Sequence, residues 1–185
     1  MRLFVALDIP ADTREAVWRA AAPLRARAYP VRWAAPDRLH LTLKFLGDVS
    51  DARLPELRGA LHEAVQGARP VPVAVEAFGA FPAADRPRVI WAGLAAEPAL
   101  ELLQHEMERT YAPRGFPPEG RPFRPHLTLG RVRRGAAPRE FAGLGDVLDA
   151  LEVHAAAVAG AVVLMQSMLD RDGAVYQELD RERLP

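Results

Sequence analysis

Short segments in which apolar and polar residues alternate are spread along the 185-residue chain, and segments with helical spacing separate them. An alternation of period two predicts strands. The predicted strands are 2–8, 39–45, 71–78, 88–92, 125–131, 153–159, 162–170 and 175–179.

Apolar residues spaced three or four apart predict four helices. These are 12–28, 51–65, 98–111 and 138–151. In the first, Pro23 predicts a kink or a break, since proline removes a helical hydrogen bond. A Pro- and Gly-rich loop is expected over 112–125, and Arg171-Asp172-Gly173 predicts a hairpin turn.

The mixed order of these elements, with hairpins at the end, predicts an α+β fold with mostly antiparallel strands. No stretch reads as a linker between independently folding units, so residues 1–185 are expected to form a single domain. One internal repeat, described next, is separated by about half the chain, as two similar lobes would give.

The repeat is the tetrapeptide His-Leu-Thr-Leu, which occurs in RLHLTLKFLG and again in RPHLTLGR. In a strand, His40 and Thr42 point to one face and the leucines to the other, and the same holds for His126 and Thr128. With five histidines and four threonines in the chain, roughly 0.1 His-x-Thr triplets are expected by chance. The matched pair therefore indicates a functional site.

Two imidazoles that face one cleft suit general acid-base catalysis, because one can accept a proton while the other donates one. In-line displacement at phosphorus needs both at once, and threonine hydroxyls can hold the non-bridging oxygens. Competing chemistries lack their residues: Ser50 and Ser167 have no nucleophile motif, each His-x-Thr supplies a single zinc ligand, and no phosphate-binding glycine loop is present. Chemistry without a metal or another cofactor is what we expect.

Strand parity also sorts the basic residues. Arg38 and Lys44 share the face of His40, and Arg124 shares the face of His126, so all three are candidate phosphate or RNA contacts. Arg131 would point to the opposite face unless Gly130 allows a bulge. Aromatic residues that could stack on bases are Phe45, Phe123 and Tyr176.

Charge and composition narrow the setting. The 24 basic and 24 acidic residues balance, so no overall basic field favours long nucleic acid or membrane, and recognition is expected to be local. The absence of cysteine excludes disulfides and thiol catalysis and is compatible with a cytoplasmic location. The N-terminal apolar run is too short for a signal peptide, and the 11-residue run 155–165 is too short to span a membrane. Nothing indicates an obligate protein partner.

Paired HxTx motifs about half a chain apart resemble those of the 2H phosphoesterases. The segments HLTLKFLG and FRPHLTLGR, with RLFVALDIP and LMQSMLDRDGAVYQEL near the ends, are similar to the RNA 2′,3′-cyclic phosphodiesterases, also called 2′-5′ RNA ligases. The resemblance implies a bilobal duplicated fold, in which two mostly antiparallel sheets with outer helices flank a central cleft. Each lobe would contribute one HxTx strand, around 39–45 and 125–131.

The same resemblance implies hydrolysis of a 2′,3′-cyclic phosphate at an RNA end to a 2′-phosphate, independent of metal and ATP. His40 would protonate the departing 3′ oxygen, His126 would activate water, and Thr42 and Thr128 would bind the phosphate. The reverse reaction, 2′-5′ ligation, is open to the same acid and base. Two alternatives remain: a 2H phosphodiesterase for 2′-5′ oligonucleotides or a small cyclic nucleotide, and a non-catalytic RNA-end-binding protein.

Overall fold

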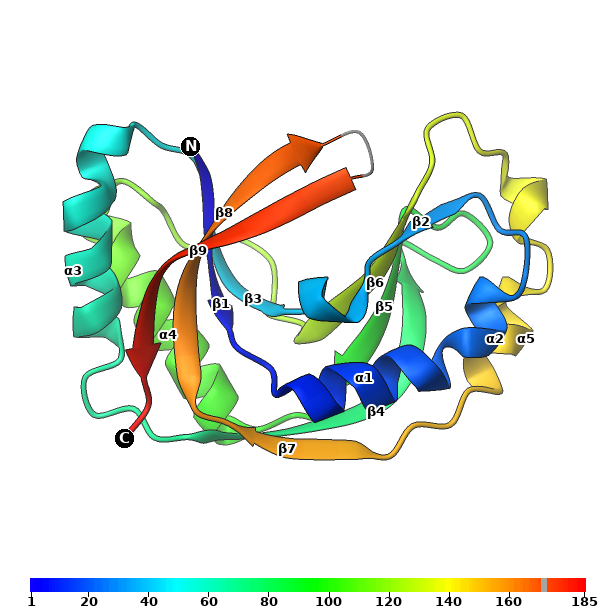
Figure 1. Cartoon of the computed structure of the whole chain (residues 1–185), viewed down its shortest axis with the longest axis horizontal. Coiled ribbons are helices and arrows are strands. Elements are labelled where there is room, and N and C mark those ends of the chain that lie inside the picture. Colours follow the sequence, from blue (N-terminus) through cyan, green and yellow to red (C-terminus); the bar gives the residue numbers. More distant parts are fainter. Residues whose placement is uncertain (171–172) are drawn as a thin grey trace.

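The computed structural model describes residues 1–170 and 173–185. The architecture is α+β, as predicted, and every strand pairing among these residues is antiparallel (Figure 1). The strands are β1 (Arg2–Leu7), β2 (Val31–Trp33), β3 (Leu41–Asp48), β4 (Val71–Phe81), β5 (Val89–Leu94), β6 (His126–Val132), β7 (Ala155–Ala159), β8 (Ala161–Asp170) and β9 (Gly173–Arg183). The helices are α1 (Ala11–Ala20), α2 (Ala22–Arg25), α3 (Leu54–Ala64), α4 (Pro98–Tyr111) and α5 (Leu144–Asp149).

Most predicted elements are present, with differences at their ends. Helix α4 has the predicted bounds, and the first helix breaks before Pro23 into α1 and α2. The predicted helix 138–151 is wrong as one element, because a 3₁₀ turn (Pro138–Phe141) and α5 are separated at Gly143, which adopts φ 75°. The predicted turn at Arg171 and Asp172 lies outside the described residues.

The strands form one curled sheet rather than two separate ones. Within the described residues its order is β7-β4-β5-β6-β3-β1-β8-β9, and the short strand β2, which the sequence pattern missed, pairs with β6. A single residue pair, Leu41 with Leu127, joins β3 to β6. We call β3, β1, β8 and β9 the His40 half of the sheet, and β6, β5, β4, β7 and β2 the His126 half.

The helices cover the outside of the curl in two groups (Figure 1). Helices α3 and α4 pack against each other, α3 also against β8 and β9, and α4 against β3 and β4. Helix α1 packs against β7 and α5 against β4.

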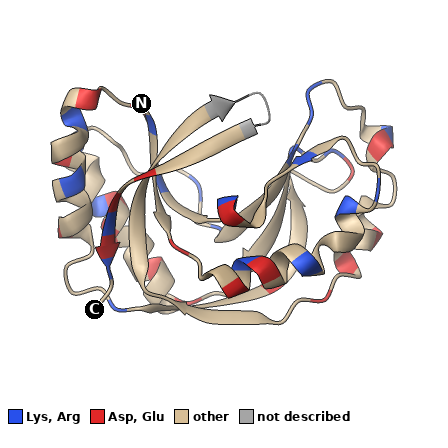
Figure 2. Cartoon of the chain, viewed as in Figure 1, with Lys and Arg blue, Asp and Glu red and all other residues tan. Residues whose placement is uncertain are grey.

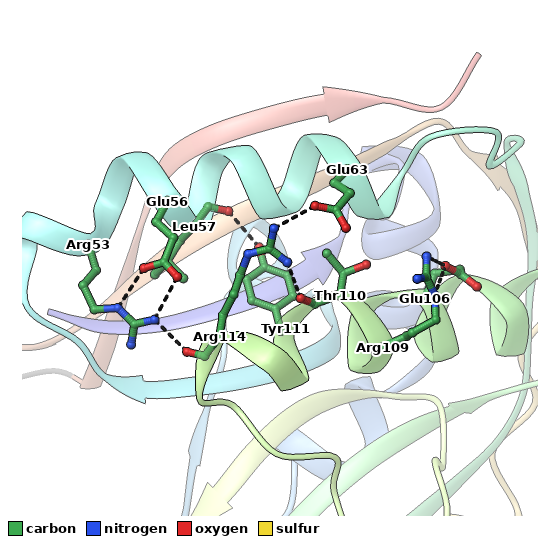
Figure 3. Close-up of polar contacts among 9 residues, drawn as sticks. All are labelled: Arg53, Glu56, Leu57, Glu63, Glu106, Arg109, Thr110, Tyr111 and Arg114. Carbon is green, nitrogen blue, oxygen red and sulfur yellow. Dashed lines mark hydrogen bonds and ion pairs between the residues drawn. The ribbon is translucent and has the colours of Figure 1, made fainter.

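The pair α3–α4 is tied together by polar contacts from the end of α4 (Figure 3). The Tyr111 hydroxyl donates to the Leu57 carbonyl at 3.0 Å, and the Arg114 guanidinium lies 2.7 Å from a Glu63 carboxylate oxygen. Arg53 donates to the carbonyl of Arg114. These contacts fix the start of the loop that leads from α4 to β6.

Leucine and valine side chains from both halves of the sheet and from the helices form one continuous core, which includes Leu41 and Leu127. A second, small cluster lies on the opposite face of β1 and β8, formed by Phe4, Ala6 and Val163. No helix among the described residues is long and apolar enough to cross a membrane.

Candidate active site

Both histidines of the repeat are held in the same way. The Nδ1 atom of His40 lies 2.8 Å from the Arg38 carbonyl oxygen, and Nδ1 of His126 lies 2.7 Å from the Arg124 carbonyl oxygen. A carbonyl only accepts, so each Nδ1 carries the hydrogen. The nitrogen left for chemistry is therefore Nε2 on both rings.

The antiparallel register brings the two motifs together crosswise. Leu41 pairs with Leu127, and in an antiparallel pair the flanking residues also lie opposite each other. His40 is therefore across from Thr128, and Thr42 is across from His126. All four side chains are half-buried on the face opposite the leucine core, so two imidazoles and two hydroxyls border one site.

Burial favours the neutral form of both imidazoles. The pKa of His40 is lowered from 6.5 to about 4, mainly by burial and to a smaller extent by the charges of Arg131 and His126, against the raising effect of its hydrogen bond to the Arg38 carbonyl. Burial also lowers the pKa of His126, and the charge of Arg131 adds to this effect. Both Nε2 atoms are thus proton acceptors at neutral pH until an anion enters.

Arg131 reaches the site because of a bulge, the alternative that the sequence left open. Thr128 pairs with Trp91 and Gly130 with Ile90, so Leu129 is an extra residue in β6. The bulge reverses the parity of the strand beyond it. Arg131 is exposed, and its charge acts on both histidines.

Lys44 was predicted to share the face of His40, and this prediction is wrong. Strand β3 has the same bulge at the same motif position, since Thr42 pairs with Ala6 and Lys44 with Val5. Lys44 therefore points to the core and is only 1% exposed. Its ammonium pairs with Glu108 on α4 and donates to the Pro117 carbonyl at 2.9 Å. It is not available to a phosphate or to RNA.

The other two basic candidates lie near the site through their backbone carbonyls. Arg38 supplies the carbonyl that orients His40, and its guanidinium donates to the Ala174 carbonyl of β9 at 3.2 Å. Arg124 supplies the carbonyl that orients His126, and its side chain is exposed at a cavity beside that ring. Contact of either guanidinium with a phosphate stays a prediction.

Aromatic rings pack against both imidazoles. Phe4 and Tyr176 each lie 4.7 Å from the His40 ring centroid, and Phe81 lies 5.2 Å from that of His126. Phe4 and Phe81 were not singled out from the sequence, since only the pairing of β1 and β4 with their neighbours brings them here. Phe45, turned outward by the bulge, is 54% exposed.

Charged residues of both signs are interspersed on the helices and loops (Figure 2). Across residues 1–170 and 173–185, no group of three or more His, Asp or Glu side chains is arranged to hold a metal ion. The imidazoles of His40 and His126 can transfer protons to and from a bound anion, which the hydroxyls of Thr42 and Thr128 and the Arg131 guanidinium can hold by hydrogen bonds.

A family model described as LigT-like phosphoesterase matches the chain twice, over residues 7–91 and 93–176, so that each match contains one His-x-Thr motif. The chain belongs to the LigT-like phosphoesterase family. It is 31% identical over 184 residues to the RNA 2′,3′-cyclic phosphodiesterase of Methanothermobacter thermautotrophicus, with 100% of this chain and 99% of the relative covered. The enzyme of the same name from Archaeoglobus fulgidus is 32% identical, with 97% and 98% covered.

Solved LigT-like structures share the fold. The crystal structure of a Thermus thermophilus protein, TT0787, gives a TM-score of 0.80 at 28% identity, covering 100% of this chain and 98% of that one. Escherichia coli LigT complexed with 3′-AMP gives 0.74 at 29% identity, covering 99% and 97%. The protein is thus a phosphoesterase with the α+β fold expected from its resemblance to the 2H superfamily.

Proposed function

We propose that the protein hydrolyses the 2′,3′-cyclic phosphate at an RNA end to a 2′-phosphate, without a metal ion or other cofactor. The matched pair of imidazoles carries the proposal, because each ring has its Nδ1 occupied and its Nε2 available at one site. Relatives named RNA 2′,3′-cyclic phosphodiesterase support the choice of substrate. We take residues 1–185 as one bilobal domain, each lobe contributing one catalytic strand, and infer a cytoplasmic location.

In the proposed reaction, Nε2 of His126 takes a proton from water as the water oxygen attacks phosphorus. The bond from phosphorus to the 3′ oxygen breaks, and Nε2–H of His40 gives its proton to that oxygen. Thr42 and Thr128 donate hydrogen bonds to the non-bridging oxygens, and Arg131 stabilises their negative charge. The assignment of acid and base to the two rings follows the resemblance to the 2H phosphoesterases.

The acid role of His40 requires a change of protonation on binding. Burial holds its pKa at about 4 in the free protein, so a proton donor at neutral pH forms only when an anion enters. A bound phosphate raises the pKa of a neighbouring imidazole by favouring its charged form. Binding of the substrate phosphate would therefore protonate His40 and make it the acid.

The test uses a short RNA that ends in a 2′,3′-cyclic phosphate, with EDTA present. We expect a 2′-phosphate product, and a loss of at least about a hundredfold in kcat for His40→Ala and for His126→Ala. His105→Ala, on the exposed side of α4, is the matched control and should retain activity. An inert wild-type protein, or full activity in either variant, would overturn the proposal.

Ligation through a 2′-5′ bond would use the same groups with a different nucleophile. The 5′-hydroxyl of a second RNA would attack phosphorus in place of water and give its proton to His126. The 3′ oxygen would leave with a proton from His40, which gives a 2′-5′ linkage. Incubating cyclic-phosphate and 5′-hydroxyl RNAs together at high concentration should give a joined product that is lost in both histidine variants.

A further inference from the structure

Beside His126 the molecule has a cavity of about 390 Å³, within the range of about 300–1,000 Å³ typical of small-molecule sites. It lies along β4, β5 and the first turn of α4, and Phe81, Trp91 and Phe123 form part of its lining. His126 lines it as well. A molecule whose phosphate sits between the two imidazoles can therefore extend directly into this cavity.

An indole forms the floor of the cavity. A Cβ atom built on Gly79 would lie 2.2 Å from the Trp91 ring, and one built on Gly93 would lie 2.8 Å from it. The ring therefore lies against the sheet across both glycines, and it is half-exposed. Because its nitrogen is buried, the surface that it presents is carbon. Such a surface suits the face of a nucleobase.

At the position of the His40 half that matches Trp91, the described strands have no aromatic side chain. Trp91 pairs with Thr128, and the residue in the same relation to the first motif is Ala6, which pairs with Thr42. Ala6 is buried in the small cluster with Phe4 and Val163. The two halves thus have the same His-x-Thr pair but differ beside it. The aromatic rings next to His40 are Phe4 and Tyr176, with the exposed Phe45 beyond Phe4, whereas the His126 half has an indole in the wall of a cavity that has room for a base.

The charges around the cavity indicate which end of a bound nucleotide lies in it and which end lies at the histidines. Three carboxylates, Glu76, Glu97 and Glu101, line the cavity, whereas Arg124 and His126 lie at its phosphate side. Glu97 already accepts from the Ala99 amide of α4 at 3.1 Å. Glu76 is turned outward by a bulge in β4 and is exposed. Carboxylates repel a phosphate chain and accept hydrogen bonds from amino and imino groups.

We propose that this cavity binds the base of the terminal nucleotide, stacked on Trp91 and read by the Glu76 carboxylate, with a preference for guanine. The proposal rests on the proposed function, since it places the scissile phosphate at His126. Guanine offers N1–H and N2–H side by side to two carboxylate oxygens, whereas adenine and cytosine offer one amino group. Uracil offers a single N–H between two carbonyl oxygens that the carboxylate repels.

The four nucleoside 2′,3′-cyclic phosphates test this directly, because they differ only in the base. We expect kcat/KM to be highest for guanosine and lowest for uridine. Trp91→Ala should raise KM between about fivefold and a hundredfold with little change in kcat, and Trp91→Phe should restore most of the loss. Trp18→Ala, on α1 at the outside of the sheet, is the matched control.

Glu76→Gln should reduce the ratio of kcat/KM for guanosine over uridine by at least about fivefold, while Glu15→Gln on α1 should leave it unchanged. Equal hydrolysis of all four substrates with no effect of Trp91→Ala on KM would overturn this inference and leave the proposed function intact. If none is hydrolysed and the cyclic-phosphate RNA is inert as well, the proposed function fails instead, and calorimetric binding of guanosine against uridine still decides whether the cavity prefers guanine. Equal binding would overturn its preference for guanine.

Discussion

At the scale of single residues, the site depends on two imidazoles that are neutral in the free protein. Each donates its Nδ1 hydrogen to a backbone carbonyl, so the tautomer is fixed and only Nε2 can exchange protons with a substrate. The pKa of each is lowered, that of His40 to about 4. The acid step that we propose nevertheless requires one ring to be protonated.

This requirement predicts an acidic optimum for kcat/KM. The profile of kcat/KM reports the free enzyme: on raising pH the acid loses its proton, and on lowering pH the base gains one. Because both pKa values lie below 6.5, the maximum should also lie below pH 6.5. The profile of kcat should be shifted to higher pH, since bound phosphate raises both pKa values.

Arg131→Gln checks the cause of that optimum. Removing the positive charge should raise the pKa of both histidines and move the kcat/KM maximum upward, while the rate falls because the phosphate loses a partner. Arg134→Gln, in the exposed loop after β6, should leave the maximum in place. A wild-type maximum at pH 7 or above, or no movement in Arg131→Gln, would contradict the interpretation.

The histidines and threonines could be singled out from the sequence because the same tetrapeptide, His-Leu-Thr-Leu, occurs twice. Such a coincidence is rare in a chain with five histidines. Phe4, Phe81 and Trp91 could not, since each reaches the site through pairing with a distant strand. The sequence around Trp91 does not show whether its side chain lines a cavity or packs in the core. The role of Trp91 becomes visible only in the structure, where its ring lies flat across Gly79 and Gly93.

At the scale of elements, the bulges in β3 and β6 decide which side chains reach the site. Strict alternation assigned Lys44 to the cleft and Arg131 away from it, and each bulge reverses that assignment. A bulge exists only relative to a partner strand, so the sequence of one strand cannot fix its position. Helix α4, by contrast, begins at Pro98 and has an apolar stripe, both local signals, and its bounds were predicted correctly.

The buried Lys44 ties three elements together and gives a prediction at this scale. It links β3 to Glu108 on α4 and to the Pro117 carbonyl in the loop before β6. Lys44→Met leaves the Glu108 carboxylate buried without its cation, and removing one partner of such a pair costs about 3–5 kcal/mol of unfolding free energy. Urea unfolding followed by circular dichroism measures it.

The double variant Lys44→Met with Glu108→Leu distinguishes the contribution of the ion pair to stability from the contribution of side-chain packing. It removes both charges, so most of the lost stability should return. Arg19→Met, a basic residue on the exposed side of α1, should change stability by no more than about 0.5 kcal/mol. A loss below about 1 kcal/mol in the single variant would mean that the pair does not hold these elements together.

At the scale of the whole molecule, the two halves repeat one plan with different surroundings. The residue after each His-Leu-Thr-Leu is Lys44 in one half and Gly130 in the other. Lys44 extends to α4, whereas a Cβ on Gly130 would lie 2.5 Å from Val31 and 2.8 Å from Trp33 of β2. Glycine therefore lets the extra strand β2 pack beside β6, and the two equivalent His-x-Thr segments lie next to different neighbouring residues.

The balanced charge of the chain limits how much RNA it can hold. With 24 basic and 24 acidic residues, interspersed along the helices and loops (Figure 2), only the terminal phosphate and about one neighbour should be neutralised. For single strands the logarithm of affinity falls with a slope of about −0.7 per phosphate contacted. Between 50 and 200 mM salt, kcat/KM should therefore fall only about three- to sevenfold.

The measurement compares a dinucleotide and a 20-nucleotide RNA that share the same 3′ end with a cyclic phosphate, each across that salt range. The two substrates should have kcat/KM values within about threefold of each other, since nothing beyond the end is bound by a basic track. A fall of a hundredfold with salt, or a strong advantage of the longer RNA, would show that the chain follows RNA along its backbone. In that case the arginines around the cleft, rather than the terminal phosphate and base, would determine substrate choice.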